Sequence, residues 1–471
     1  MKTPFRFGAR KEPSPDYAPP PAGEADAWTM LRGPSQGMAP SADWSPTESD
    51  EAADKPPAVE RGEPRRPDLP ARVGTLKPSA GGAVGYAGAS RIETWRSITT
   101  LETLGRPAEP HRLRLHAPVH SPAPAPLFEA PSLPERITAA HRARLLVPPT
   151  EFFAVPGHEL GGLGLLQQAG RVWVHEAVQP AYLNDAVQPD RLALPDAWTG
   201  SLLAADAEII ETDTPVGVAL HPNMGYGNFL IEMLPRLLLL ARLRAFGRPL
   251  PVAVPSDAPT WLQAFVALIF DASETIRYDS RRQRLRAPCF VLPGMMQDDA
   301  RFHPELNSLV EALLARVVGP TLPLPRPPGR LFLSRRFLRG RHGVANEAEM
   351  ELAFVDLGFT VVHPQEHALP EQLAMYAGAE CIAADYGPAA HNALFAPRGT
   401  SLVCVGWRDH RQSGVAALRG QPIAFLPTQG AGFFDPAQPG DPKAPPPRVD
   451  GDALSARVKE FLRFAEVQRG G

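Results

Sequence analysis

The sequence predicts an α/β protein with two Rossmann-like lobes, preceded by a disordered, proline-rich tail and a β-rich segment. Three observations support this fold class. Strand-like and helix-like runs alternate between Gly329 and Pro397, and a second alternation occupies residues 229–318. The first 70 positions, in contrast, contain 14 prolines and few strong apolar side chains. Such a segment cannot offset its ordering entropy by burial, so it is expected to be disordered.

The composition fits a soluble globular protein of balanced charge. The chain has 471 residues, of which 44% are hydrophobic, and 48 basic against 51 acidic side chains give a formal net charge of -3. This length allows about two to four domains. The near balance of charge excludes the global positive field that binds nucleic acid or an anionic membrane, so any anion site must be local.

The cysteines and the apolar runs favour a cytoplasmic protein. Cys289, Cys381 and Cys404 are far apart and odd in number, which predicts reduced thiols without zinc-site spacing. No apolar run of the secretory type follows Met1. The most apolar run, residues 229–240, falls short of the roughly 20 residues that cross a bilayer. No transmembrane segment is expected, whereas peripheral membrane association and the oligomeric state stay open.

The first part of the chain contains the tail and the N-terminal lobe. Residues 1–90 are expected to form the tail, which is either a docking segment for a partner with an aromatic groove or a linker of biased composition. Residues 91–319 are expected to form the N-terminal lobe, whose β-rich start includes hairpins near 161–164 and 171–175. The predicted helices of this lobe lie at 229–243, 260–270 and 304–318, and its predicted strands at 251–255 and 290–292.

The C-terminal lobe, residues 329–471, follows a proline-rich linker at 320–328. Its pattern is that of a nucleotide-binding half-domain, with strands and helices in strict alternation. The strands are predicted at 330–334, 360–363, 381–384 and 401–405, and the helices at 347–357, 370–379 and 388–395. An amphipathic helix at 453–467 closes the chain.

Basic side chains gather after the first strand of this lobe. Ser334 is followed by Arg335, Arg336, Arg339 and Arg341. A guanidinium group can hold two phosphate oxygens at once and neutralise their charge, so these residues predict a diphosphate site. The alternative interpretation is a solvated basic loop.

Two further groups of polar residues stand at the ends of predicted elements. Gly387 begins a helix with a proline at its first position, where free backbone N–H groups could face an anion, although an ordinary tight turn explains it equally well. His391 and Asn392 follow on that helix and could reach a ribose or base edge, or form a buried polar pair.

Asn346 and Glu347 stand at the start of the helix predicted at 347–357. They are candidates for the ligand site, but the pattern favours a structural role. Asn346 at the N-cap with Glu349 three residues later is typical of a capping arrangement.

The chain resembles glycosyltransferase family 61, the capsular polysaccharide biosynthesis type. The segment from His221 to Leu237, HPNMGYGNFLIEMLPRL, is similar to the family pattern NYGHFLx(E/D)xLPRL. The second lobe agrees at LFLSRR (331–336), at Asn346 with Glu347, and from Gly387 through HNALFAP (391–397). The resemblance covers roughly residues 200–407, in the family's order.

The resemblance implies a two-lobed GT-B arrangement and an inverting, metal-independent transfer. The sugar would move from a nucleotide-sugar donor to a hydroxyl of a polysaccharide or glycolipid acceptor, without any further cofactor. The C-terminal lobe would hold the nucleotide-sugar, and the N-terminal lobe would present the acceptor. Chemistry of this kind needs a diphosphate site, a base near the acceptor hydroxyl and walls that exclude water.

The catalytic base is the least defined of these parts. The family generally has His at the position of Asn228, and His or Asp at the position of Tyr386. Three candidates for the base remain, namely Glu232, His221 and Asp385. Glu232 could instead pair with Arg236 one turn later, and His221 could be structural.

These two departures leave a second hypothesis open. A protein with Asn228 and Tyr386 at those positions could be a catalytically degenerate subunit of the same fold, which binds sugar nucleotides or serves in assembly without turnover.

Overall fold

The computed structural model describes residues 104, 109–130, 133–168, 207–221, 225–245, 247, 249–298, 300–318, 329–338, 344–408, 410–429 and 446–470, and short strands at 89–90, 96–98, 171–173, 187–188 and 191–192. Of the tail predicted at 1–90, only the strand β1 (Ala89–Ser90) falls in this set. The rest of the tail, the predicted linker 320–328, and Arg339 and Arg341 lie outside the described residues.

The described elements confirm the predicted mixed α/β class. By its contacts the chain divides into Met1–Arg72 and Val73–Gly471, and every described element belongs to the second unit. Among the described residues, three sheets have six or seven strands. We call them the first sheet, the outer sheet and the parallel sheet.

The first sheet is mixed in direction. Its order is β16 (Thr275–Tyr278), β15 (Val252–Pro255), β14 (Val216–Gly217), β18 (Cys289–Pro293), β7 (Thr150–Pro156), β3 (His111–His116) and β2 (Arg96–Ile98). The strands β15 and β18 are buried along their whole length and confirm the strands predicted at 251–255 and 290–292. Continuous apolar runs of this kind are typical of strands covered on both faces.

The outer sheet packs against the first sheet. Its order is β1, β10 (Arg171–Trp173), β9 (Leu165–Gln168), β8 (Glu159–Gly161), β17 (Gln283–Arg286) and β13 (Glu208–Glu211). A shared core joins Phe153 and Phe290 of the first sheet to Leu160 and Leu285 of the outer sheet. The antiparallel pairs β8–β9 and β9–β10 confirm the predicted hairpins.

The parallel sheet occupies the C-terminal part of the chain. Its order is β22 (Thr360–Val362), β21 (Arg330–Leu333), β23 (Cys381–Asp385), β24 (Ser401–Val405), β25 (Ile423–Leu426) and β5 (Leu127–Phe128), with all strands parallel. The strands predicted at 330–334, 360–363, 381–384 and 401–405 are confirmed. The strand β25 was not predicted, because its four residues stand between two prolines.

The strand β5 lies far from its partners in the sequence. Leu127 and Phe128 belong to the segment assigned to the N-terminal lobe, yet they pair with Ile423 and Ala424 of β25. The following helix α3 (Glu135–Arg142) also reaches the C-terminal part, where His141 bonds to Ser413 at 3.0 Å. The early chain thus completes the edge of a sheet that forms around residues 330–426.

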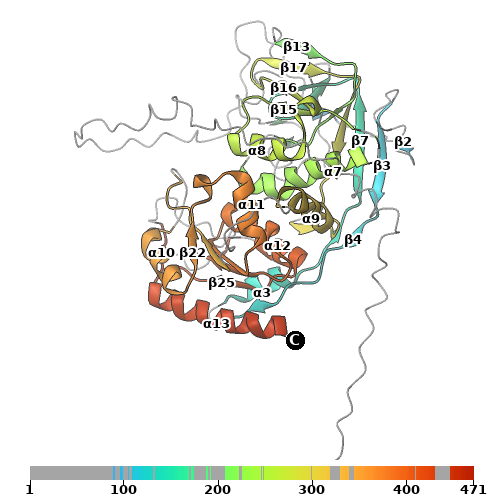
Figure 1. The fold of residues 1–471 in the computed structure, drawn as a ribbon. Helices are drawn as coiled ribbons and strands as arrows, with labels where there is room; N and C mark the ends of the chain where they lie inside the picture. The colour runs from blue at the N-terminus through green and yellow to red at the C-terminus, as the bar shows by residue number, and fades with distance from the viewer. Residues whose placement is uncertain are drawn as a thin grey trace, which may run out of the picture. The chain divides into compact units, whose positions relative to one another are not determined.

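The helices agree with the predicted positions. They are α6 (Tyr226–Asn228), the π-helical turn η2 (Phe229–Met233), α7 (Leu234–Ala245), α8 (Thr260–Ile269), α9 (Leu306–Val317), α10 (Glu347–Asp356), α11 (Leu369–Ala377), the 3₁₀-helix η5 (Pro388–Phe395), α12 (Arg411–Arg419) and α13 (Gly451–Gly470). Figure 1 shows α8 and α9 next to α11, and α9 next to α12, in agreement with the contacts between these helices. Of this set, α12 was not predicted.

The described residues also include short elements outside the three sheets. The two-stranded pairs are β4 (Val119–His120) with β6 (Leu146–Val147), β11 (Val187–Gln188) with β12 (Arg191–Leu192), and β19 (Gln297–Asp298) with β20 (Arg301–Phe302). Two 3₁₀ turns are η3 (Ala272–Glu274) and η4 (Pro364–Glu366).

A polar joint ties α12 to α9 and η5. The buried Arg419 donates to the Asn307 side chain at 2.9 Å, to Glu311 at 3.1 Å and to the backbone carbonyl of Ala396 at 2.8 Å. Asn307 in turn donates to the carbonyl of Leu418 at 2.8 Å. The two Nη atoms of the buried guanidinium therefore bond to side chains and backbone of both neighbouring elements.

Candidate active site

The order of the parallel sheet defines a switch point between β21 and β23. The chain passes from β21 to β22 on one side and then returns to β23 on the other side. In open α/β sheets, ligands bind outside the carboxyl ends of the strands at such a point. Arg335 follows β21, and Asp385 is the last residue of β23, so both lie at this edge.

The guanidinium of Arg335 lies between Asp385 and Gly387. Its Nη1 is 3.5 Å from Asp385 Oδ2, and the two side chains are only 9% and 12% exposed. A Cβ atom on Gly387 would lie 2.7 Å from the same Nη1. Any side chain at position 387 would therefore displace the guanidinium, so glycine is required for this arrangement.

Asp385 titrates near neutral pH. Burial raises the pKa of its carboxyl from 3.8 to about 7, and the charge of Glu347 adds to this increase. Arg335 and Arg408 act in the opposite direction, but they do not compensate for the loss of solvation. A carboxyl in this state can hold or release a proton under physiological conditions.

Two carboxylates of α10 hold the turn that carries Arg335. Glu347 accepts a hydrogen bond from the backbone N–H of Arg335 at 3.1 Å. Glu351, one helical turn later, accepts from the Ser334 hydroxyl at 2.7 Å and from Arg336 at 3.0 Å. Burial raises the pKa of Glu347, more than its contacts with Arg335 lower it. Ser334, Glu347 and Glu351 thus fix the turn, while Arg335 faces Asp385.

Arg336 is more exposed than Arg335. Its side chain is 45% exposed, pairs with Glu351 and lies 5.4 Å from the Phe337 ring. Arg336 therefore lies at the solvent-exposed edge of the group formed by Arg335, Asp385 and Glu351. Arg341, the other predicted phosphate ligand, lies outside the described residues.

Asn346 occupies the N-cap of α10, as predicted, but its side chain does not form the expected cap. Instead, it donates to the carbonyl of Val449 at 2.8 Å and accepts from the N–H of Val449 at 2.9 Å. It also donates to Glu349. The capping interpretation is therefore wrong at this point, because both ends of the amide are used to fasten the segment that leads into α13.

His391 and Asn392 join η5 to the start of α6. Asn392 accepts a hydrogen bond from the Tyr226 hydroxyl at 2.7 Å, and it is buried. The His391 ring packs against Gly227, where a Cβ atom would lie 3.0 Å from it, and the ring also bonds to Gln412. Tyr226 was not singled out from the sequence, although it stands inside the segment that carries the family resemblance.

Glu232 of η2 and His221, four residues after β14, form a buried pair. His221 Nε2 lies 3.1 Å from Glu232 Oε2, and the side chains are 1% and 3% exposed. Burial lowers the pKa of His221, despite the opposing effect of Glu232. Glu232 stands in the π-helical turn η2, and turns of this kind are frequent at functional sites.

Arg236, the predicted partner of Glu232, has other hydrogen bonds. Its Nε donates to the carbonyl of Pro293 at 2.9 Å and its Nη2 to the carbonyl of Val218 at 3.3 Å. These bonds tie α7 to the ends of β18 and β14.

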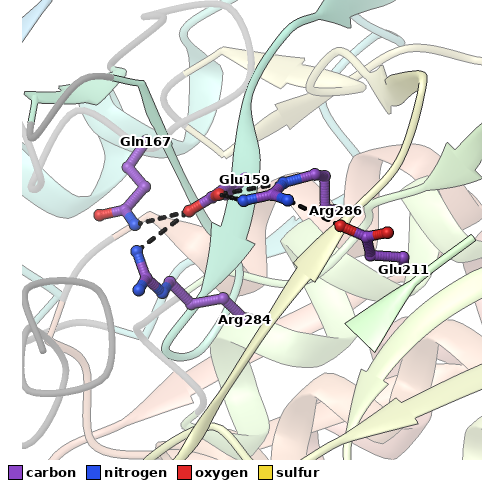
Figure 2. Close-up of polar contacts among 5 residues, drawn as sticks. All are labelled: Glu159, Gln167, Glu211, Arg284 and Arg286. Atoms are coloured by element: carbon purple, nitrogen blue, oxygen red, sulfur yellow. Dashed lines mark hydrogen bonds and ion pairs between the residues drawn. The ribbon is translucent and has the colours of Figure 1, made fainter. Parts of the chain in front are cut away.

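A second group of charges lies on the outer sheet and was not predicted (Figure 2). Glu159 of β8 accepts hydrogen bonds from Arg284 at 3.0 Å, from Arg286 at 2.6 Å and from Gln167 at 3.3 Å, and Arg286 also pairs with Glu211. Partial burial raises the pKa of Glu159, but the bonds to Arg286 and Arg284 lower it by more. The network crosses four strands in register, so its role is to hold the sheet together.

The described residues contain no group of three or more His, Cys, Asp or Glu side chains arranged to hold a metal ion. Within the same residues, none of the helices has the length and the apolar composition to span a membrane.

Comparison with known proteins found a family match in the central part of the chain. Residues 226–403 match the family model described as Glycosyltransferase 61. The matched region begins at Tyr226 and includes Glu232, Arg335, Asp385 and Asn392. A search of the curated proteins found no match.

Proposed function

We propose that this protein transfers a sugar from a nucleotide-sugar to a hydroxyl of a polysaccharide or glycolipid acceptor, with inversion at the anomeric carbon, because residues 226–403 match the Glycosyltransferase 61 family model. The observation that supports the donor site is the position of Arg335, beside Gly387 at the switch point of the parallel sheet. A buried guanidinium next to a glycine offers both charge and close approach to a diphosphate.

The proposal divides the two substrates between the two α/β regions, as in a GT-B enzyme. The parallel sheet would hold the nucleotide-sugar at Arg335, Arg341 and the backbone of Gly387. The region around the first sheet would present the acceptor near η2. The reaction would take place in the cytoplasm, where nucleotide-sugars are made, and the product would serve surface polysaccharide or glycolipid synthesis.

Inversion needs a base on the acceptor side of the sugar, opposite the leaving diphosphate. Asp385 is 3.5 Å from the guanidinium assigned to the diphosphate, so it lies on the wrong side for this role. We assign the base to Glu232, with His221 as the partner that orients its carboxylate. Since Glu232 is only 3% exposed, the proposal requires a local opening of η2 before the acceptor can bind.

Calorimetry with nucleoside diphosphates tests the donor site. Arg335→Ala and, separately, Arg341→Ala should each weaken binding by about 1.5 to 3 kcal/mol, because each loses a charge-assisted contact. Arg457→Ala is the matched control, since Arg457 is partly exposed and pairs with Glu460 on α13. Unchanged affinity in both site variants would remove these arginines from the donor site.

The proposed transfer uses no divalent ion, because arginine and backbone N–H groups would neutralise the leaving diphosphate. Turnover should therefore persist after dialysis against EDTA. Loss of turnover that a divalent cation restores would overturn this part of the proposal.

A second candidate function is nucleotide-sugar binding without turnover. The burial of Glu232 and His221 favours it, as does the presence of Asn228 and Tyr386 at positions where the family generally has titratable side chains. Restoring Asn228→His together with Tyr386→His in a turnover assay separates the two candidates. A degenerate protein should gain activity, whereas a competent enzyme should not. Histidine is preferable to aspartate at position 386 because a second carboxyl beside Asp385 would add like charge.

A further inference from the structure

Asp385 and the proposed diphosphate share one guanidinium. Arg335 Nη1 lies 3.5 Å from Asp385 Oδ2, in space that the missing side chain of Gly387 leaves open. The backbone N–H of Arg335 is already bonded to Glu347. A diphosphate that binds Arg335 must therefore share the guanidinium with the carboxyl of Asp385.

Among the described residues, the groups that face Asp385 include no buried cation other than Arg335. Arg335 approaches from the exit of β21, Glu347 from α10 and Arg408 from the exit of β24, with the Cys404 thiol on the neighbouring strand. Glu347 repels the carboxylate, and Arg408 is an exposed side chain. A diphosphate would add further negative charge to this group. The repulsion disappears if the carboxyl takes up a proton, which it does readily because its pKa is already about 7.

We propose that Asp385 takes up a proton when the nucleotide-sugar binds, and that its hydroxyl then donates a hydrogen bond to a diphosphate oxygen of the leaving group. This inference rests on the donor site proposed above. It assigns to Asp385 the task of a hydrogen-bond donor to the departing diphosphate and not that of the base.

The step balances without any further reactant. The acceptor oxygen forms a bond to the anomeric carbon, and the proton of the acceptor hydroxyl passes to the base. The bond between the anomeric carbon and the phosphate oxygen breaks, and its electron pair stays on the nucleoside diphosphate. The Asp385 hydroxyl stabilises the charge that develops there, and its proton returns to solvent when the diphosphate leaves.

Proton counting by calorimetry tests the proposal. The full-length protein is titrated with UDP-glucose, UDP-N-acetylglucosamine and GDP-mannose in buffers of different ionisation enthalpy. The diphosphate of these probes is a diester that does not titrate near neutral pH, so any proton taken up belongs to the protein. We expect uptake of about half a proton at pH 7 and about one at pH 8, and an affinity that falls about tenfold per pH unit above pH 8.

Two variants identify the group that takes up the proton. Asp385→Asn should bind the probe without proton uptake, with an affinity that stays constant within about twofold from pH 6 to pH 9. Glu347→Gln, which removes the other carboxyl of the group, should retain the uptake. Binding without uptake by the wild-type protein would overturn the inference, as would uptake that Glu347→Gln abolishes and Asp385→Asn keeps.

The design separates this inference from the proposed function. If none of the probes and no nucleoside diphosphate binds, the donor site itself is wrong. If a probe binds without proton uptake, only the role of Asp385 is wrong. The wild-type measurement alone decides this point, so the test holds even if Asp385→Asn does not fold.

Discussion

Burial of the Asp385 carboxyl lowers the stability of the folded protein at neutral pH. Its carboxyl is 12% exposed, and burial raises its pKa to about 7 in the folded protein, against 3.8 as its ordinary value. The folded state therefore holds a proton that the unfolded chain releases. The corresponding stability is fully present below about pH 4 and is lost as the pH rises through about 7.

The residue-scale prediction concerns the pH dependence of unfolding without ligand. Between pH 5 and pH 8 the wild-type protein should lose about 3 kcal/mol more unfolding free energy than Asp385→Asn, since the carboxyl releases its proton over about two pH units and each unit corresponds to about 1.4 kcal/mol. Urea unfolding at the two pH values measures the difference.

A matched variant controls for the loss of a carboxyl in general. Asp356 is exposed at the end of α10, and Asp356→Asn should change the unfolding free energy by less than about 0.5 kcal/mol. Parallel pH profiles for the wild type and Asp385→Asn would show that Asp385 is charged throughout this range.

At the scale of elements, α12 depends on a glycine in its interior. A Cβ atom on Gly414 would lie 1.8 Å from the carbonyl oxygen of Ala300, in the turn between β19 and β20. Helix and turn therefore touch backbone to backbone. Ala300 itself has a φ of 56°, which is uncommon for a residue other than glycine.

Gly414→Ala should destabilise the protein, although alanine is the better helix former. The gain in helix propensity from glycine to alanine is about 1 kcal/mol. The clash, however, forces α12 away from the turn and costs about 1 to 3 kcal/mol or more. The net effect should be a lower Tm in thermal unfolding. Gly451→Ala is the control, because its Cβ atom would meet Ala353 at an ordinary 3.9 Å. A Tm for Gly414→Ala equal to or above the wild type would contradict the close approach.

The sequence predicted most elements of the parallel sheet, because continuous apolar strands alternate there with helices of clear period. It missed α12, whose run RQSGVAALR contains Gly414 and looks like a broken helix. It also missed β5, because two residues between prolines acquire strand structure only from a partner nearly 300 residues away.

The candidate site was predicted in its residue types but not in its contacts. The sequence predicts Arg335 as a phosphate ligand and Asp385 as a candidate base, but it does not predict that the two side chains lie next to each other. Their proximity depends on the strand order β22-β21-β23, which no local pattern specifies. The bond between Tyr226 and Asn392 likewise joins segments that only tertiary packing brings together.

At the scale of the whole molecule, the unit Val73–Gly471 contains the three sheets and every candidate site residue that the structure describes. Packing of α9 against α12 through Arg419, and the bond between Tyr226 and Asn392, connect the regions of the first sheet and the parallel sheet. The matched family region, residues 226–403, extends across both.

Removal of residues 1–72 should leave the rest of the protein folded and able to bind nucleotides. We expect the Tm and the affinity for nucleoside diphosphates to match those of the full chain. Deletion of residues 1–90 also removes β1, which pairs with β10 at the edge of the outer sheet. Comparison of the two deletions therefore separates the effect of the tail from the effect of this strand. A loss of nucleotide affinity on the shorter deletion would place part of the site in the tail.

The pairing of β5 with β25 has a consequence for the order of folding. During synthesis, Leu127 and Phe128 leave the ribosome long before Ile423 is made, so this edge of the parallel sheet must wait for almost the entire polypeptide. Contacts of such high sequence separation are slow to form. The regions of the first sheet and the parallel sheet should therefore complete folding together and late. Neither region expressed alone would form the complete parallel sheet.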